Sequence, residues 1–383
     1  MNLNYHKMKF LRLAFYVLIA QLVLSGCAGE AVEETSSSSS SEINFDAYLG
    51  RNASTRAGVT DINFLKQDPN TWYAGFGVFA RYKHNGEISS LMDTERVTWN
   101  KNHWEYTNTR YWPNEGFVDF YAFAPYNGGV IMGKLPDNLV NNPDSKDETY
   151  IYFPSNVSPI DLVYANAEKQ TKDSISSING KVKFQFKHAL ARLGLDIKAN
   201  QKLEKNGAVI TVEEVDLYGP EDYKGVFDMV GYLNLKTGGW HVVKEESTRW
   251  YYAWTPTGKV GKEDGNNGKR KCQKLSASQL DHTTPIITND PNSYIFIIPQ
   301  TKDEKFHLKI TYTVKQGDFV EKVTVKKNLL EVLDPSETSN KSFTFEGGKA
   351  YVFHLILSLD PIDFKVKPKV EDWNGVIDET MPL

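Results

Sequence analysis

Three small residues, Gly75, Gly77 and Ala80, have the spacing of the G-x-G-x-x-A fingerprint that binds dinucleotides. In that fingerprint the glycines let a tight turn approach the pyrophosphate, after a buried strand and before a helix. Here polar residues 68–71 precede the motif and the strand-like residues 79–82 follow it. The pattern therefore favours a plain strand with small residues, and we expect no cofactor.

Candidate metal ligands fail on spacing. Residues 264–268 begin like a calcium loop, but Gly268 and Lys269 stand where an oxygen ligand and the invariant glycine belong. Leu275 replaces the bidentate glutamate of such a loop. The eight histidines show no H-x-x-H or H-E-x-x-H spacing, and no cysteine pair exists for zinc. We expect no metal site.

Catalytic patterns are equally weak. His188 lies on the apolar face of a predicted strand, where a histidine is more often a hydrogen-bonded core residue than a ligand or catalyst. Cys272 lies among four cations between Lys269 and Lys274, which are groups that can activate a thiolate, but nothing else supports a reactive cysteine. No G-x-S-x-G elbow is present, and carboxylate pairs identify no glycosidase without geometry. The sequence predicts no catalytic residue and no enzyme.

An aromatic cluster leaves two interpretations. If they were exposed, these side chains could stack on sugar rings; if buried, they would fill the core of a β-sandwich. Their alternation favours the core. The cluster consists of Trp99, Trp104, Tyr106, Tyr111 and Trp112.

The residues before Cys27 have the order of a secretory signal peptide. Lys7, Lys9 and Arg12 precede an apolar run over residues 13–24, and small residues stand next to the cysteine. A transmembrane anchor is the alternative, but about a dozen apolar residues are fewer than the roughly 20 that span a bilayer. The Leu-Ser-Gly-Cys ending resembles a bacterial lipobox, which implies removal of residues 1–26 and lipidation of Cys27 on its thiol.

Lipidation of Cys27 would leave Cys272 without a partner, so no intrachain disulfide is expected. Residues 27–42 are rich in serine and acid and predict a flexible tether. The glutamates that closely follow Cys27 resemble the surface-export signals of some Gram-negative lipoproteins; a solvated acidic linker is the alternative. The expected location is the cell surface, with the lipid in the outer membrane.

Length and charge limit the remaining classes. A chain of 383 residues is long enough for two domains. Its formal net charge is −4. The charged residues among residues 1–26 are all basic, so their removal would make the chain more acidic. A modestly acidic chain shows no electrostatic footprint for nucleic acid and no polybasic patch for anionic lipid.

After the tether, residues 43–49 alternate apolar and polar side chains, which predicts a half-buried strand. Residues 50–58 follow as a small, polar stretch that contains Arg51 and Arg56. The sequence therefore predicts a strand and then an exposed loop with two arginines.

The rest of the chain is also β-rich, and no segment shows a sustained apolar stripe with a 3.6-residue period. Residues 308–314 and 323–325 flank a Gln-Gly-Asp turn and predict a hairpin. Residues 182–188 and 193–197 alternate on opposite parities, which predicts a bulge or bend between them. The fold class is all-β. Further strands are expected at residues 77–82, 104–106, 118–123 and 351–359.

Composition suggests the domain limits. The polar stretch 166–180 lies between apolar segments and marks a junction. We expect a leader over residues 1–26, a tether over 27–42, an N-terminal domain over 43–172 and a C-terminal domain over 173–383.

Several segments in order resemble the fimbrillin family of pilus subunits, over most of the chain after the tether. The segments that carry the resemblance are Arg110–Pro113, Val118–Pro125, Asp161–Ala165, Phe186–Leu193, Ile297–Gln300 and Val370–Trp373. The resemblance implies two transthyretin-like β-sandwich domains, export as a lipoprotein precursor and assembly with other subunits into type V pili.

In that family an arginine-specific protease removes an N-terminal strand, and a strand of the next subunit replaces it. The resemblance places the removed strand at residues 43–49 and the cut after Arg51 or Arg56. Residues 362–370 are a candidate donor strand, because their apolar residues alternate at the same period and Pro368 is tolerable at an edge or bulge. A permanent edge strand and an uncut loop are the alternatives.

The resulting hypothesis is a stalk, tip or anchor subunit of an adhesive pilus, whose filament contacts a host or bacterial surface. The alternative is a non-polymerising surface lipoprotein that binds glycans through exposed aromatic residues. A hydrolase is disfavoured by the motif search.

Overall fold

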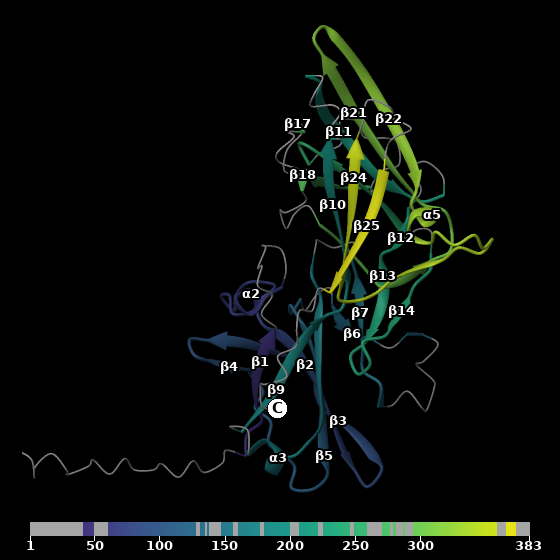
Figure 1. Ribbon diagram of the computed structural model, residues 1–383. Coiled ribbons are helices and arrows are strands. Elements are labelled where there is room, and N and C mark those ends of the chain that lie inside the picture. The colour runs from purple at the N-terminus through teal and green to yellow at the C-terminus, as the bar shows by residue number, and fades with distance from the viewer. Residues whose placement is uncertain are drawn as a thin grey trace, which may run out of the picture. The chain divides into compact units, whose positions relative to one another are not determined.

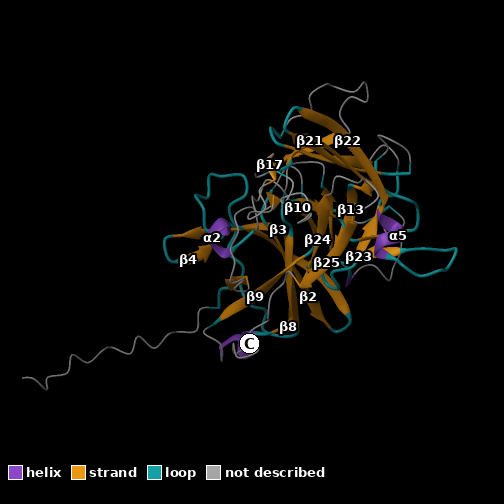
Figure 2. Ribbon diagram, turned by 45° about the horizontal axis from the view of Figure 1, so that its top comes forward, coloured by secondary structure: helices purple, strands orange, loops and turns teal. Residues whose placement is uncertain are grey.

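A computed structural model describes residues 41–49, 60–127, 131–134, 136–137, 147–155, 160–176, 180–199, 207–220, 225–245, 249–258, 270–275, 279–280, 286–287, 294–357 and 365–372. Strands dominate these ranges, as expected, and residues 42–383 belong to one compact unit (Figures 1 and 2). The described helices are short: α2 (Ile62–Leu65), α3 (Lys172–Ser176) and α5 (Leu329–Leu333). The expected all-β fold is confirmed.

The first sheet has the strand order β1-β9-β8-β5-β2-β3-β4. Its strands are β1 (Asn44–Leu49), β2 (Phe76–His84), β3 (Glu87–Asn100), β4 (His103–Glu105), β5 (Phe117–Ala124), β8 (Val163–Gln170) and β9 (Lys181–His188). Gly77 and Ala80 of the motif lie in β2, which is the strand that the sequence favours at this position. A side chain at Gly77 would lie 2.4 Å from the Phe123 ring, so packing explains this glycine.

The central strands of this sheet are buried on both faces. Val78 and Phe120 belong to one apolar cluster, whereas Phe79, Tyr121 and Phe123 belong to another. The second cluster also packs against a sheet of order β14-β13-β7-β6. The strands of that sheet are β6 (Met132–Gly133), β7 (Tyr150–Pro154), β13 (Val230–Asn234) and β14 (Trp240–Val242).

The chain changes sheets after β9. Residues 189 and 190 connect β9 to β10 (Ala191–Ala199), which pairs in parallel with β24 (Lys349–Leu357), and this bend agrees with the change of parity in the sequence. In this sheet β10 and β24 are neighbours, and β25 (Lys365–Asp372) pairs with β24 (Figure 1). Two further strands pair with β10: β18 (Ile286–Ile287) and β19 (Ile295–Ile297).

A third apolar cluster joins β10 and β24 to a sheet built around β11 and β21. The predicted hairpin is present, since β21 and β22 connect through Gly317 and Asp318 and leave Phe319 and Val320 exposed near the turn. The strands of this sheet are β11 (Val209–Tyr218), β12 (Phe227–Asp228), β15 (Arg249–Thr255), β16 (Arg270–Lys274), β17 (Gln279–Leu280), β21 (His307–Gln316) and β22 (Phe319–Asn328). A two-stranded sheet contains β20 (Gln300–Lys302) and β23 (Phe343–Phe345).

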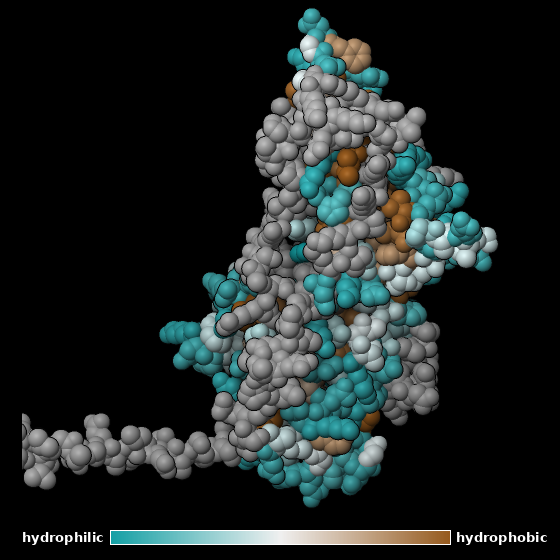
Figure 3. All heavy atoms as spheres, viewed as in Figure 1, coloured by the Kyte–Doolittle hydropathy of each residue, from teal (hydrophilic) through white to brown (hydrophobic). Residues whose placement is uncertain are grey.

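The division into domains over residues 43–172 and 173–383 stays a prediction. β9 follows that boundary in the sequence and pairs with β1 and β8 in the first sheet. On the face drawn in Figure 3, the described surface is mostly hydrophilic with scattered apolar groups.

Candidate functional site: the groove occupied by β1

The predicted strand at residues 43–49 is confirmed as β1, and its apolar face points into the core. Ile43, Phe45 and Leu49 are buried, and Ala47 packs against the same cluster. Phe45 is 1 % exposed. Fully burying side chains of this kind contributes about 1.5–3 kcal/mol each, so β1 is well anchored by its apolar face.

Aromatic rings line the groove around Phe45. Its ring centroid lies 5.5 Å from Tyr106, 5.6 Å from Phe184, 5.8 Å from Phe120 and 6.5 Å from Phe76. The angles between rings include edge and stacked arrangements, which are the favoured geometries of aromatic pairs. A strand that takes the place of β1 must therefore supply a large apolar side chain here.

Hydrogen bonding holds β1 as a strand on one edge. Among the described strands β1 pairs with β9, in parallel, from Asn44 opposite Lys181 to Leu49 opposite Phe186. At the other edge, contacts gather at its start. The Ile43 amide donates to the Arg110 carbonyl at 2.8 Å, and an isolated bridge joins Glu42 to Tyr111.

Tyr106 completes this terminal contact. Its hydroxyl donates to the Ile43 carbonyl at 2.8 Å and accepts from the Arg110 amide at 3.1 Å. The pKa of Tyr106 is raised, mainly because the side chain is partly buried. The hydroxyl therefore stays protonated and remains a donor at neutral pH. β1 is thus fixed by one ladder and by a few bonds at Ile43.

The chain is fixed again at Thr60, after residues 50–59, which carry the two arginines. The Thr60 amide donates to Asp161 Oδ2 at 2.8 Å, and its hydroxyl donates to the Asp161 carbonyl at 2.6 Å. Asp161 Oδ1 lies 3.0 Å from His188 Nδ1, at the end of β9. All three residues are buried, so His188 is the hydrogen-bonded core residue that the sequence favours.

The three predicted modification residues cannot be located structurally. Cys27 precedes the described residues, and Arg51 and Arg56 lie in residues 50–59, which are also outside them. In the sequence, both arginines stand between the end of β1 and the Thr60 anchor. Lipidation and cleavage at these residues stay predictions.

The aromatic cluster is mostly core. Trp104 and Trp112 are buried, and Trp99 and Tyr106 are partly buried against the same cluster. Tyr111 is 57 % exposed. Sequence analysis did not single out Trp72, which is 72 % exposed and whose polar neighbours in the sequence, Asn70 and Thr71, are a signal of exposure.

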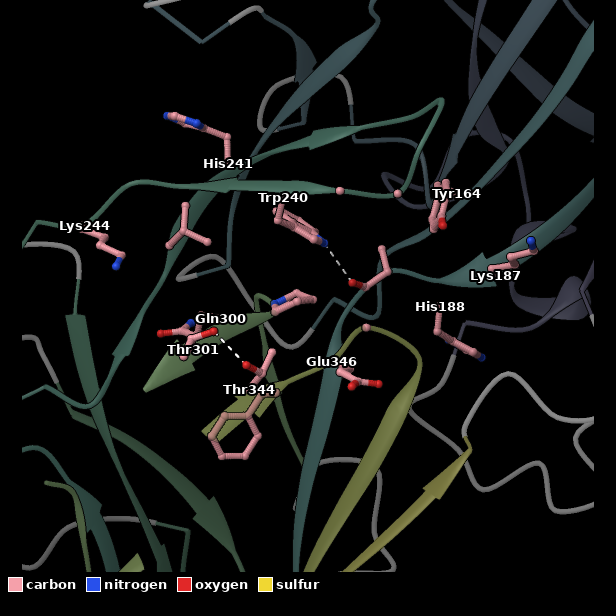
Figure 4. A pocket seen from close by; sticks show the side chains of 17 residues that line it. Tyr164, Lys187, His188, Trp240, His241, Lys244, Gln300, Thr301, Thr344 and Glu346 are labelled. Carbon is pink, nitrogen blue, oxygen red and sulfur yellow. Dashed lines mark hydrogen bonds between the residues drawn. The ribbon is translucent and has the colours of Figure 1, made fainter. Parts of the chain in front are cut away.

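A second recess lies beside the end of β9 (Figure 4). This cavity of about 630 Å³ is lined by Lys187, Trp240, Lys244 and Glu346, among others. The Trp240 indole donates to the Ala189 carbonyl at 3.0 Å, so its polar atom is already used. The lining mixes charged side chains with aromatic surface.

A buried ionic cluster lies elsewhere, around Lys302. The Lys302 ammonium lies 2.9 Å from Glu304 Oε1, which also contacts the Arg249 guanidinium. Burial lowers the pKa of Lys302 and raises that of Asp228, which lies 3.7 Å from Arg249. Sequence reasoning missed this cluster because Asp228, Arg249 and Lys302 are far apart in the chain. Its opposite charges pair with one another, which suits a structural role.

The described residues show neither a membrane-spanning helix nor a metal-binding cluster. No helix there is long and apolar enough to cross a membrane. No group of three or more histidine, cysteine, aspartate or glutamate residues in those ranges is arranged to bind a metal ion.

Comparison with known proteins gives consistent matches. The chain is 24 % identical to "Fimbrium subunit Fim1C" of Phocaeicola vulgatus, across 93 % of this chain and 95 % of that protein. A crystal structure of a fimbrial protein from Bacteroides vulgatus superposes with a TM-score of 0.58 at 19 % identity, covering 87 % of this chain and 99 % of that one. That likeness shows a shared fold.

A model of the fimbrillin-like family matches residues 55–373. This match begins between Arg51 and Arg56 in the sequence and extends through β25. It covers most of the chain, including β9 and the other strands that line the groove. The chain therefore belongs to the fimbrillin-like family.

Proposed function

We propose that this protein is a structural, non-enzymatic subunit of a cell-surface adhesive pilus, and that it assembles by exchange of the strand in the β1 groove. The observation that carries the proposal is β1 itself. Its buried face fills an aromatic groove, while among the described strands its ladder is with β9 and its other edge is held by contacts near Ile43. Family membership and the relatives named as fimbrial proteins support the same function.

The exchange follows from strand chemistry. Removal of β1 would expose the unpaired edge of β9 and an apolar trough around Phe76, Phe120 and Phe184. Such an edge pairs readily with an added strand whose side chains alternate at the same period. The subunits of a filament would thereby fill one another's grooves.

Residues 362–370 are the proposed donor of this chain. Residues 362–364 lie outside the described ranges, and residues 365–370 lie in β25, which pairs with β24 alone among the described strands. Pro368 therefore stands in an edge strand, where a missing amide is tolerated. Release of β25 would leave β24 paired with β10.

Processing after Arg51 or Arg56 would free β1, and lipidation of Cys27 would hold the precursor in the outer membrane. The test is to treat the full-length surface lipoprotein with an arginine-specific protease and to sequence the new N-terminus. We expect products that start at Asn52 or Ala57, and filaments formed only after the cut. The matched control is the double variant Arg51→Ala, Arg56→Ala, which should remain uncut and monomeric.

An intact wild-type chain, or filaments formed equally by the control, would contradict this maturation. Lipidation is tested separately by labelling cells with a fatty-acid analogue. The label should appear on the wild type and disappear in Cys27→Ala. Equal labelling of both chains would exclude Cys27 as the attachment site.

Glycan binding is a second candidate, because Trp72 and Tyr111 are mostly exposed. An exposed aromatic ring offers a flat apolar face on which a sugar ring could stack. In that case, sugars should quench tryptophan fluorescence, and Trp72→Ala should abolish the quenching. Unchanged fluorescence over a panel of surface glycans would exclude this function at Trp72.

A further inference from the structure

We infer that the β1 groove selects a donor strand with acidic outward positions, and therefore a strand of a different subunit rather than residues 362–370 of a second copy of this chain. The inference rests on the proposed strand exchange and names the partner of that groove. It is carried by the charges of β9, the strand with which any donor must pair.

The outward positions of β9 are strongly basic. Its inward residues Val182, Phe184 and Phe186 are buried in the apolar cluster. The alternating positions therefore face away from that cluster, and they are Lys181, Lys183, Gln185 and Lys187. Lys181 and Lys183 are partly exposed and stand within the ladder of β1, and the exposed Lys187 follows one residue past the end of that ladder, where a longer donor would meet it.

β1 complements this basic row. Residues 42–49 include Glu42 and Asp46 and contain no cation. In the parallel register Asp46 stands opposite Lys183, and the uncharged Asn44 and Tyr48 stand opposite Lys181 and Gln185. Opposite charges across a strand pair stabilise it, whereas like charges directly opposite destabilise it.

The proposed donor of this chain does not complement the row. If Ile362, Phe364 and Val366 fill the groove, the outward positions are Asp363, Lys365, Lys367 and Lys369. With all four outward positions overlapped, either strand direction places two lysines directly opposite lysines of β9. The mismatch therefore does not depend on whether the donor enters parallel or antiparallel.

Among the described residues, the other side of the groove offers no equivalent ladder. β4 lies on that side and carries Glu105, which accepts a hydrogen bond from Asn100 at 2.9 Å and lies 3.6 Å from His103. β4 pairs with β3 and not with β1. The cross-strand partners of a donor are consequently set by β9.

The experiment uses the full-length chain cut between residues 50 and 59, either by the arginine-specific protease or at an engineered protease site in that stretch. Two peptides of residues 360–372 compete with the N-terminal fragment for the groove. One has the native sequence, and the other has the substitutions Lys365→Glu, Lys367→Glu and Lys369→Glu. The readout is the peptide concentration that releases half of the fragment, measured by size separation and mass spectrometry.

We expect the glutamate peptide to act at about a tenfold lower concentration than the native peptide in low salt. This preference should shrink at 0.5 M NaCl as the ions screen the charges. On the acceptor variant Lys181→Glu, Lys183→Glu, Lys187→Glu the order of the peptides should reverse. Because the main comparison uses the native acceptor, it does not depend on the folding of that variant.

The outcomes separate the two levels of the proposal. Equal release by both peptides, or a preference for the native one, overturns the charge selection and leaves strand exchange intact. Release by neither peptide overturns strand exchange and the selection with it. Failure of the arginine-specific protease, with normal release after the engineered cut, counts against processing at the arginines alone.

Discussion

Two parallel strand pairs, β1–β9 and β10–β24, are alike in apolar burial and differ in how many neighbouring strands they pair with. In both, one strand buries a row of apolar residues in a cluster: Phe45 of β1 in the first and Phe353 of β24 in the second. β24, however, has a ladder on each edge, with β10 and with β25, whereas β1 has one with β9. Equal burial thus goes with different edge pairing among the described strands, and under the proposed exchange the strand with one ladder is the one that is replaced.

The largest test of this comparison is a pair of core truncations. Phe45→Ala and Phe353→Ala each remove a ring that is 1 % exposed, and such changes cost about 3–5 kcal/mol. We expect Phe353→Ala to lower the global free energy of unfolding. We expect Phe45→Ala to raise hydrogen exchange mainly in β1 and β9. Urea unfolding combined with hydrogen-exchange mass spectrometry measures both effects.

A global loss of protection in Phe45→Ala, equal to that in Phe353→Ala, would contradict a separable β1.

The Thr60 anchor gives the next largest effect. Asp161→Ala removes the carboxylate that accepts from the buried Thr60 amide and contacts His188, which should cost about 1–3 kcal/mol. Exchange should rise at residues 60–66 while the β10–β24 pair keeps its protection. Asp46→Ala, on the exposed face of β1, is the control and should leave residues 60–66 unchanged.

Uniform loss of protection across the chain in Asp161→Ala would show that Asp161 supports more than this anchor.

A smaller change tests the start of β1. Tyr106→Phe keeps the ring beside Phe45 and removes the hydroxyl that links Ile43 to Arg110. We expect a loss of about 1 kcal/mol, seen as faster exchange at the first residues of β1. Tyr111→Phe is the matched control, because Tyr111 is mostly exposed. Equal exchange in both variants would assign the hydroxyl no part in retaining β1.

The smallest effect concerns pH. Burial lowers the pKa of Lys83, but hydrogen bonds to Asp119 and Asp147 raise it above the usual 10.5 overall. Burial likewise raises the pKa of Asp147, but Lys83 and Lys236 lower it below the usual 3.8 overall. The contribution of Lys83 is full below pH 10.5 and is lost as the pH rises above it. The contribution of Asp147 is full above pH 3.8 and is lost as the pH falls below it.

These residues join β2, in the sheet of β1, to the segments before β7 and after β13. Asp147→Asn should therefore weaken the acid dependence of unfolding by less than about 1 kcal/mol, since Asp147 is partly exposed. The exposed Asp137→Asn is the control. If stability falls equally at low pH in the wild type and in Asp147→Asn, the ion pairs of Asp147 do not contribute to the acid dependence of unfolding.

Local sequence patterns predicted the strands that have one solvent-exposed and one buried face. β1, β9 and the β21–β22 hairpin alternate in the sequence and were found where the alternation predicts them. The strand expected at residues 118–123 was found as β5, but its burial on both faces, without a polar row, could not be predicted from alternation. The parallel pairing of β1 with β9 was also beyond local reasoning, since the two strands are far apart in the chain.

The site could be predicted only in part. The strand in the groove was identified from its alternation, while the anchor behind it joins residues separated by 101 and 27 positions. The Lys302 cluster likewise unites residues from several strands that carry no common motif. Chemistry assembled by the fold from distant, individually ordinary residues leaves no trace in spacing.

The attachment of Thr60 to Asp161 also limits how far from the domain the new N-terminus could lie after cleavage. A cut after Arg56 would leave residues 57–59 ahead of Thr60, and an extended chain spans at most about 3.6 Å per residue. The new α-amino group would then stay within about 11 Å of the Thr60 amide, which donates to Asp161. A fluorophore coupled to that amine would lie at the same position on every subunit. Energy transfer between such labels would report the distance between neighbouring subunits.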